Sequence, residues 1–495
     1  MNTVGASQQS RLMGSIFAHL LWLVLLPASD VMGSEPERAL TAFVGVNVVS
    51  MESAAILYDQ TVLVEDGHIT VVSPRAITEI PPHATVQHAD GNYLMPGISD
   101  MHAHIFGYNE HDMAGAGSLP ENQLLLYVAT GVTTLRDANG SPDHFEHRRK
   151  IQSGTWLGPD LFFTSPVLEG KDAVWDFSKK IDEPSLAAPL VAEFADSGYW
   201  GVKVYHTLRP EVYEAILLAA REYGLPVIGH VPFGVGVESA IAAGQYGIEH
   251  LRGYDFDGIS TDVLELDGGR SAERFRSWQT MTDARRDELV GMTVEAGVWN
   301  APTLAVNQFL SDADARRELT LHPRYSVVHP TLRAWIADSE SYDTLFSDEA
   351  RQALEDSRPF IQKFVRQLSS AGGNLLVGTD SLLPGYVPGF TPIDEIKAFV
   401  EAGLTPFEAL RAATSAPAES LGLSDVMGTV SVGKVANLIL LDGNPLENVD
   451  ALWSLQGVML HGVWHPMAEL HRRLKELASA REAAIAAASP AHTRN

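Results

Sequence analysis

Two histidines, His102 and His104, stand on either side of one alanine in the segment GISDMHAHIFG, residues 97–107. Successive side chains of a β-strand point to opposite faces, so residues two apart share a face at a spacing of roughly 6.5 Å. Two neutral imidazoles in this arrangement can bind one metal ion. Zinc usually takes at least three protein ligands, so the pair alone does not define a site.

Further potential ligands stand at or near the ends of other apolar runs. Lys203 lies in GVKVYH, His230 ends LPVIGH, His250 ends YGIEH and Asp380 ends NLLVGTD. The intervals between the first three fit one strand, one helix and the next strand. The chain has no cysteine, so any metal must be held by nitrogen and oxygen. Together with the histidine pair, these residues predict a metal centre.

The elements that must position these residues alternate between strands and helices. Besides the strand that delivers His102, the candidate strands are 131–137, 161–168, 201–206, 225–230, 246–250, 298–304 and 374–380. Helix-like segments lie between most of them, such as 210–224, which ends in a glycine. Eight strands followed by helices predict a (β/α)₈ TIM-type barrel, in which the C-terminal strand ends meet at one mouth. Periodicity leaves a doubly wound open sheet as the alternative.

The two ends of the chain have a different sequence pattern. Short alternating runs near residue 43, at 61–73, at 428–445 and at 455–467 predict antiparallel strands, with a tight Asp66-Gly67 turn. We expect a small composite β-sandwich domain built from both ends. The predicted parts are a signal peptide at 1–34, sandwich segments at 35–95 and 426–466, the barrel at 96–425, and a C-terminal helix and tail at 467–495.

The first 34 residues resemble an export signal. Arg11 precedes a mostly apolar stretch that ends at Ala28, and small residues follow up to Ser34. This layout predicts cleavage between Ala28 and Ser34, a periplasmic or secreted protein and no stable membrane association after cleavage. An uncleaved anchor is the alternative.

The net charge of −27 argues against nucleic acid as a partner, because binding phosphate requires a basic surface. The expected partner is a small-molecule substrate. A barrel of this size is compatible with a homo-oligomer, although the sequence shows no interface signal.

The motifs GISDMHAHI, GVKVY, GLPVIGHVP, GIEHL and VGTDS resemble the metal-site motifs of the amidohydrolase superfamily, in its imidazolonepropionase-like and prolidase-like branch. The resemblance covers roughly residues 40–465 and includes both chain ends. Asn437 stands where the family usually has aspartate, outside the metal residues. The resemblance implies two divalent ions, expected to be zinc. His102, His104 and Asp380 would hold one ion, His230 and His250 the second, and an N-carboxylated Lys203 would bridge them.

The chemistry of lysine supports that bridge. A protonated lysine has no acceptor, and a cation between two metal ions would be repelled, whereas carboxylation makes it an anion. Two metals that share a water molecule can lower its pKa to near 7, and Asp380 would transfer the proton. We therefore expect hydrolysis of an amide or other C–N bond, in a dipeptide or N-acyl amino acid. A lactone or phosphotriester hydrolase, or a non-catalytic metal-dependent binding protein, are the alternatives.

Two further residues are candidates for contacts with the substrate. Tyr205 and Arg252 each lie two positions past a predicted ligand and would share its face if the strand continued. Tyr205 could stabilise an oxyanion, and Arg252 could bind a substrate carboxylate. Arg136 and Asp137 are expected to form an internal ion pair, and the segment 305–349 is expected to be an unusually long loop.

Overall fold

The computed structural model describes residues 40–105, 120–266, 270–311, 321–328, 333, 346–381 and 386–488. The predicted signal peptide at 1–34 and the tail at 489–495 lie outside the described residues. Among the described helices, none combines the length and the apolar character needed to cross a membrane.

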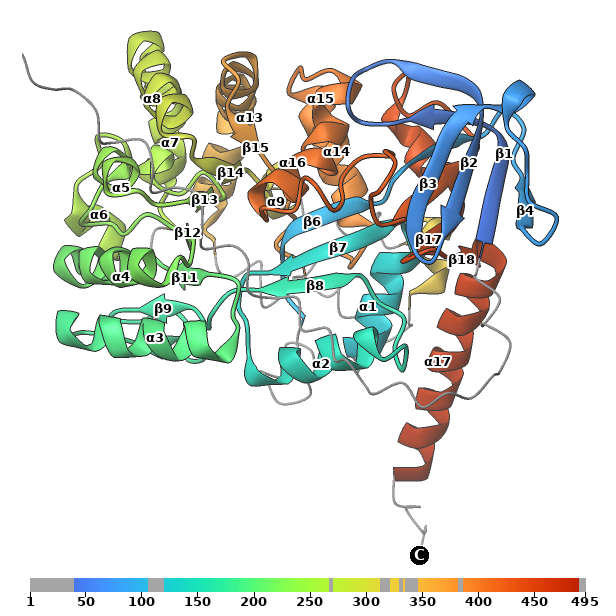
Figure 1. Ribbon diagram of the computed structural model, residues 1–495. Coiled ribbons are helices and arrows are strands. Elements are labelled where there is room, and N and C mark those ends of the chain that lie inside the picture. The colour runs from blue at the N-terminus through green and yellow to red at the C-terminus, as the bar shows by residue number, and fades with distance from the viewer. Residues whose placement is uncertain are drawn as a thin grey trace, which may run out of the picture. The chain divides into compact units, whose positions relative to one another are not determined.

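Strands from both ends of the described chain form one eight-stranded sheet (Figure 1). They are β1 (Leu40–Val49), β2 (Ile56–Glu65), β3 (His68–Pro74), β4 (Thr85–His88), β5 (Tyr93–Pro96), β16 (Leu438–Leu441), β17 (Leu455–Leu460) and β18 (Val463–Pro466). Their order is β18-β17-β16-β5-β1-β2-β3, and β4 pairs with β1. The two chain ends therefore meet as expected, while the two-layered sandwich stays a prediction.

The Asp66-Gly67 turn joins β2 to β3. Both residues have positive φ, 50° and 82°, as the tight turns of twisted hairpins require. The core of this sheet is apolar and contains residues from both ends, among them Phe43, Leu94 and Met459, each with no exposed surface. Burial of such side chains is worth about 1.5–3 kcal/mol each, so this region contributes stability.

All eight strands predicted for the middle of the chain are present, and they pair in parallel. One sheet contains β6 (Ile98–Ala103), β7 (Val132–Asp137) and β8 (Asp160–Phe163). The other has the order β10-β9-β11-β12-β13-β14-β15. Its strands are β9 (Leu168–Glu169), β10 (Lys179–Lys180), β11 (Val202–Val204), β12 (Val227–Gly229), β13 (Gly247–Glu249), β14 (Trp299–Ala301) and β15 (Asn374–Leu375). Single parallel bridges, Thr164 with Gly201 and Ala103 with Ser381, link the two sheets.

Helices follow most of these strands. They are α1 (Pro120–Ala129), α2 (Pro142–Gln152), α3 (Ala187–Ser197), α4 (Pro210–Tyr223), α5 (Val237–Ala243), α6 (Thr261–Leu266), α7 (Ala272–Thr280), α8 (Asp283–Ala296), α9 (Leu304–Ser311), α13 (Asp348–Ser370), α14 (Thr391–Glu401), α15 (Pro406–Arg411), α16 (Ser415–Ser420) and α17 (Met467–Ala488). Short 3₁₀ helices are η1 (Arg75–Ile77), η3 (Pro184–Leu186), η4 (Tyr254–Phe256), η5 (Pro323–Val327) and η6 (Val449–Ser454). The predicted helix at 210–224 is α4, which begins with Pro210 and ends at the left-handed Gly224.

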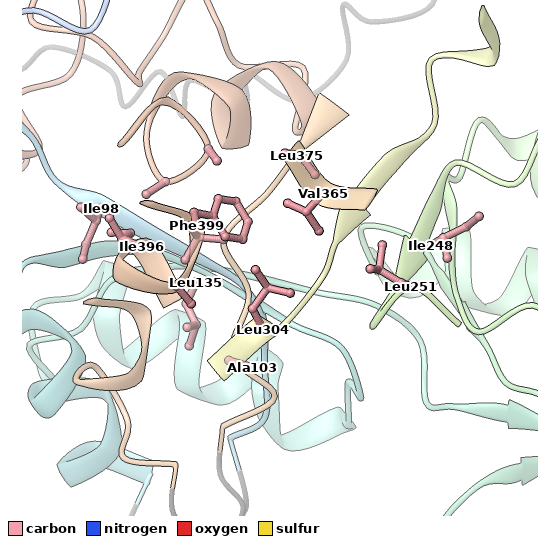
Figure 2. Close-up of a cluster of buried hydrophobic side chains, with 14 of the residues drawn as sticks. Ile98, Ala103, Leu135, Ile248, Leu251, Leu304, Val365, Leu375, Ile396 and Phe399 are labelled. Atoms are coloured by element: carbon pink, nitrogen blue, oxygen red, sulfur yellow. The ribbon is translucent and has the colours of Figure 1, made fainter. Parts of the chain in front are cut away.

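A large apolar cluster packs these helices against the parallel strands. Ile396 and Phe399 of α14 belong to it together with Ile98 of β6 and Leu135 of β7, as Figure 2 shows. Because interiors pack as densely as organic crystals, this cluster fixes the strands whose ends carry the predicted ligands.

The prediction of a loop over residues 305–349 is wrong at its start, because α9 extends to Ser311. The apolar residues of α9 recur at helical spacing and are buried, which stabilises a helix there. The segment also contains η5. Residues 312–320, 329–332 and 334–345 lie outside the described part.

Candidate metal centre

The eight residues proposed from the sequence as ligands or substrate contacts line one cavity of about 160 Å³. They are His102, His104, Lys203, Tyr205, His230, His250, Arg252 and Asp380. His102 and Lys203 lie on β6 and β11, and His230 and His250 directly follow β12 and β13. The C-terminal ends of parallel strands thus bring together residues that are far apart in the sequence.

Asp380 lies among three of the imidazoles. Its Oδ1 is 2.9 Å from His104 Nε2 and 3.4 Å from His102 Nε2, and its Oδ2 is 4.0 Å from His250 Nε2. Ligand atoms of His102, His250 and Asp380 all lie within 4.8 Å of one another. Burial raises the pKa of Asp380, but the three imidazoles outweigh burial and hold the pKa well below its usual range. An ionised carboxylate therefore faces the Nε2 atoms.

Contacts at Nδ1 orient three of the imidazoles. His102 Nδ1 is 2.5 Å from Glu249 Oε2, His250 Nδ1 is 2.8 Å from Thr303 Oγ1, and the Nδ1 atoms of His206 and His230 are 3.1 Å apart. Such partners fix the ring and leave the other nitrogen for a metal. Consistent with this, His230 Nε2 is buried and has no hydrogen-bond partner among the described residues.

Lys203 is buried between charged groups, with 2% of its surface exposed. Its Nζ lies 3.3 Å from His102 Nε2. Burial lowers its pKa to about 8, although Glu249 and Asp380 act in the opposite direction. At pH 7 the neutral amine is then roughly one lysine in ten, against about one in a thousand for an unperturbed side chain. This neutral form is the one that carboxylation requires.

The predicted ion pair between Arg136 and Asp137 is wrong. Arg136 donates to Glu249 Oε1 at 2.8 Å and to the Met101 carbonyl at 2.6 Å, whereas Asp137 Oδ2 accepts from the Ile105 amide at 2.6 Å. Neighbouring residues of a strand point to opposite faces, so the side chains of Arg136 and Asp137 point apart and do not pair with each other.

Glu249 is a site residue that the sequence reasoning missed. Burial raises its pKa, but Arg136 and His102 outweigh burial and bring the pKa to about 2. Its position directly before His250 is the signal that could have identified it.

The backbone around the cavity is strained. Eight described residues other than glycine have positive φ, and four of them line the cavity. These four are His250 (56°), Leu251 (55°), Thr303 (49°) and Asp380 (55°). Each such residue costs on the order of 1–3 kcal/mol and persists only where the surrounding structure imposes it. All four residues lie beyond the ends of parallel strands, beside the candidate ligands.

An aromatic group forms one wall of the cavity. Tyr205 stacks on His230 with ring centroids 4.0 Å apart, and its hydroxyl accepts a hydrogen bond from Trp175 Nε1 at 3.0 Å. Burial raises the pKa of Tyr205 to about 12, so the phenol stays protonated and can donate. Glu169 anchors the segment that carries Trp175, accepting from the amides of Val174 at 3.1 Å and Trp175 at 3.2 Å.

A group of positive charges faces the cavity beside the imidazoles. Arg252 Nη1 donates to Asp255 Oδ2 at 3.1 Å, and Arg274 Nε lies 3.2 Å from the same oxygen. Two guanidinium groups share one carboxylate. Arg252 Nε is buried without a hydrogen-bond partner among the described residues. This arrangement suits a negatively charged group of a substrate.

The donor set fits divalent zinc. Neutral imidazoles and a carboxylate are nitrogen and oxygen ligands that zinc accepts. The pKa values of His230 and His250 are held well below 6.5, mainly by burial, so these rings are neutral. Neutral imidazole is the form that binds a metal.

Comparisons with known proteins extend this picture. An adenine deaminase from Chelativorans sp. (strain BNC1) is 30% identical over 242 residues, which are 47% of this chain and 36% of that protein. The match therefore spans about a third of that relative's length. The N-acetylgalactosamine-6-phosphate deacetylase of Escherichia coli O157:H7 is 23% identical over 414 residues, 81% of this chain and 94% of the deacetylase.

Among solved structures, a Xaa-Pro dipeptidase with bound methionine has a TM-score of 0.64 at 20% identity, covering 86% of this chain and 100% of the other. At this identity the likeness concerns the fold. The model of the amidohydrolase family matches residues 93–465, a range that contains every predicted ligand. The family resemblance in the motifs is thus confirmed, and the chain belongs to the amidohydrolase family.

Proposed function

We propose that this protein hydrolyses an amide bond of a small carboxylated substrate, a dipeptide or an N-acyl amino acid, with the help of two zinc ions. The observation that carries the proposal is the convergence of four imidazoles, Lys203 and Asp380 on one cavity. The known relatives support the bond type, since their names describe deaminase and deacetylase activities. We further propose that the two parallel sheets close into one barrel through the bridges at Thr164 and Ala103.

The ligand roles follow the family resemblance. His102, His104 and Asp380 would hold one ion, and His230 and His250 the other. Lys203, carboxylated, would bridge them. Bound metal supplies Lewis acidity, which polarises the carbonyl and lowers the pKa of a bound water to near 7.

Asp380 transfers the proton of the reaction, and Tyr205 stabilises the negative charge that develops on the carbonyl oxygen. The ionised Asp380 carboxylate accepts the proton of the attacking water and delivers it to the leaving nitrogen. The protonated Tyr205 hydroxyl donates to the oxyanion of the tetrahedral intermediate, a contact that is strongest in the transition state. Trp175 holds this hydroxyl in place without removing its proton, because the indole is a donor.

Arg252 binds the carboxylate of the substrate. Its planar fork suits a carboxylate, and Asp255 holds the guanidinium by one arm while Nε stays available. The bound carboxylate orients the amide over the metal centre, which lowers the entropy cost of the reaction.

The test is a substrate panel with purified protein, before and after chelation and after zinc is restored. We expect turnover of dipeptides or N-acyl amino acids that disappears on chelation and returns with zinc. Lactones and phosphotriesters serve as the contrasting substrates. Turnover confined to those compounds, or no metal-dependent turnover at all, contradicts the proposal.

We also propose that residues 1–34 direct export and are then removed. The support is the sequence pattern alone. N-terminal sequencing of the protein recovered from the producing cells checks it, and a mature chain that begins upstream of Ala28 contradicts it.

A further inference from the structure

Apolar side chains from three helices form part of the lining of the same cavity. They are Phe275 and Trp278 of α7, Val306 and Leu310 of α9, and Leu354 and Ile361 of α13. Four of these side chains, Phe275, Trp278, Leu354 and Ile361, belong to the large core cluster. We call these six residues the apolar wall.

The apolar wall adjoins the positive charges. Arg274 shares Asp255 with Arg252, and its guanidinium carbon lies 4.0 Å from the ring centre of Phe275. A cationic site for a carboxylate and an apolar surface thus stand side by side in the cavity. In an α-amino acid the carboxylate and the side chain are bonded to the same carbon atom, so the two groups reach such neighbouring sites together.

We propose that the substrate half bearing the carboxylate is an α-amino acid with a large apolar side chain, such as phenylalanine or leucine, and that the apolar wall binds this side chain. This inference rests on the proposed function and deepens it by naming the substrate class. Arg252 takes the carboxylate, and the scissile amide nitrogen then lies toward Asp380 and Tyr205.

The composition of the apolar wall, with Phe275, Trp278, Leu310 and Ile361 among its six side chains, suits a large apolar group. Burial of a large apolar side chain is favourable by about 1.5–3 kcal/mol, whereas an alanine side chain leaves the wall in contact with water. The wall therefore discriminates between large and small amino acids.

The first experiment compares kcat/KM for N-acetyl derivatives of phenylalanine, leucine, alanine and aspartate, and for N-acetylphenylalanine amide. We expect the phenylalanine and leucine compounds to exceed the alanine compound by about 10- to 200-fold. In N-acetylphenylalanine amide the carboxylate is blocked, and we expect its kcat/KM to lose the advantage over the alanine compound. Equal rates for phenylalanine and alanine overturn the inference but leave the proposed amide hydrolysis intact.

The second experiment fills the apolar wall. Leu310→Trp is expected to lower the ratio of kcat/KM for N-acetylphenylalanine to kcat/KM for N-acetylalanine at least tenfold. The matched control is Leu218→Trp, at a position of α4 that is 58% exposed and away from the cavity. If both substrates slow equally in Leu310→Trp, the wall does not bind the side chain.

A third measurement separates this inference from catalysis. Calorimetry of the zinc-loaded wild-type protein with the free amino acids L-phenylalanine and L-alanine measures binding of the product half alone. We expect phenylalanine to bind at least tenfold more tightly than alanine. Equal affinities overturn the substrate class, even if no substrate in the panel is hydrolysed. Tighter binding of phenylalanine supports the proposed substrate class, even when no substrate is hydrolysed.

Discussion

The eight-stranded sheet and the cavity at the parallel strand ends differ in the side chains that they bury. The sheet buries apolar side chains such as Phe43 and Leu94, and its positive-φ turn uses an Asp-Gly pair that tolerates this geometry. Charged side chains, those of Lys203, Glu249 and Arg136, are instead buried at and around the cavity. Positive φ occurs in both regions, at Asp59 and His461 in the sheet and its turns and at Thr303 by the cavity, so burial of charge is what distinguishes them.

The largest expected effect is on the chemistry of the cavity. Asp380→Asn keeps the size of the side chain but removes its charge and basicity, so kcat/KM is expected to fall by about 10²–10⁴-fold. Enzyme assays with a substrate from the panel measure the loss, and thermal unfolding checks that the fold persists. A variant with near-wild-type activity would show that Asp380 transfers no proton.

In the apolar sheet the expected effect is on stability alone. Phe43→Ala removes a ring with no exposed surface and should destabilise the protein by about 3–5 kcal/mol. Denaturant unfolding measures the loss, with Phe43→Leu as the milder control. The activity per folded molecule is expected to stay at the wild-type value, and a drop would mean that the two regions are not independent.

A buried carboxylate beside the cavity should make stability depend on pH. Glu395 of α14 accepts hydrogen bonds from the amides of Leu304 at 2.8 Å and Ala305 at 2.6 Å, at the start of α9. Burial raises the pKa of Glu395 to about 8, above its ordinary value of 4.5. The folded state therefore binds more protons than the unfolded state between these values.

Stability is thus expected to fall as pH rises from 4.5 to 8, by an amount on the order of a few kcal/mol. Glu395→Gln cannot ionise and should flatten that part of the stability profile. Unfolding by urea at a series of pH values measures both curves. Identical slopes for the two proteins would show that Glu395 does not titrate in this range.

The smallest expected effect concerns the orientation of one ligand. Thr303→Val removes the hydroxyl that contacts His250 Nδ1 at 2.8 Å, while Thr303→Ser retains it. Loss of such a partner typically lowers metal affinity by about 10- to 100-fold. Competition with a chelating dye measures zinc affinity directly. We expect the valine variant to bind zinc more weakly and the serine variant to match the wild type; two equal variants would contradict a role for the hydroxyl.

The sequence predicted the parallel strands and the candidate ligands that lie at or beyond their ends. Strand patterns are local, and a chemically distinctive residue at the end of each run is visible without a fold. The partners of those ligands were not predictable in this way. Glu249 meets His102 across 147 positions, and Thr303 meets His250 across 53. No local pattern encodes either contact.

The error at Arg136 has the same origin. Its neighbour Asp137 was the nearest opposite charge in the sequence, but alternation along β7 points the two side chains apart, and Glu249 of β13 is the partner. The helix α9 within the expected loop was missed because its short apolar pattern gains stability mainly from packing.

By itself, the sequence determined the residue types that can bind metal, their order, and the strands that carry them, because periodicity and ligand chemistry act within a few positions. Only the tertiary structure decided which charged groups pair, where the backbone is strained, and that an apolar wall adjoins Arg274, which shares Asp255 with Arg252. These features depend on burial and on distances between strands and helices far apart in the chain, and both arise only when the core packs.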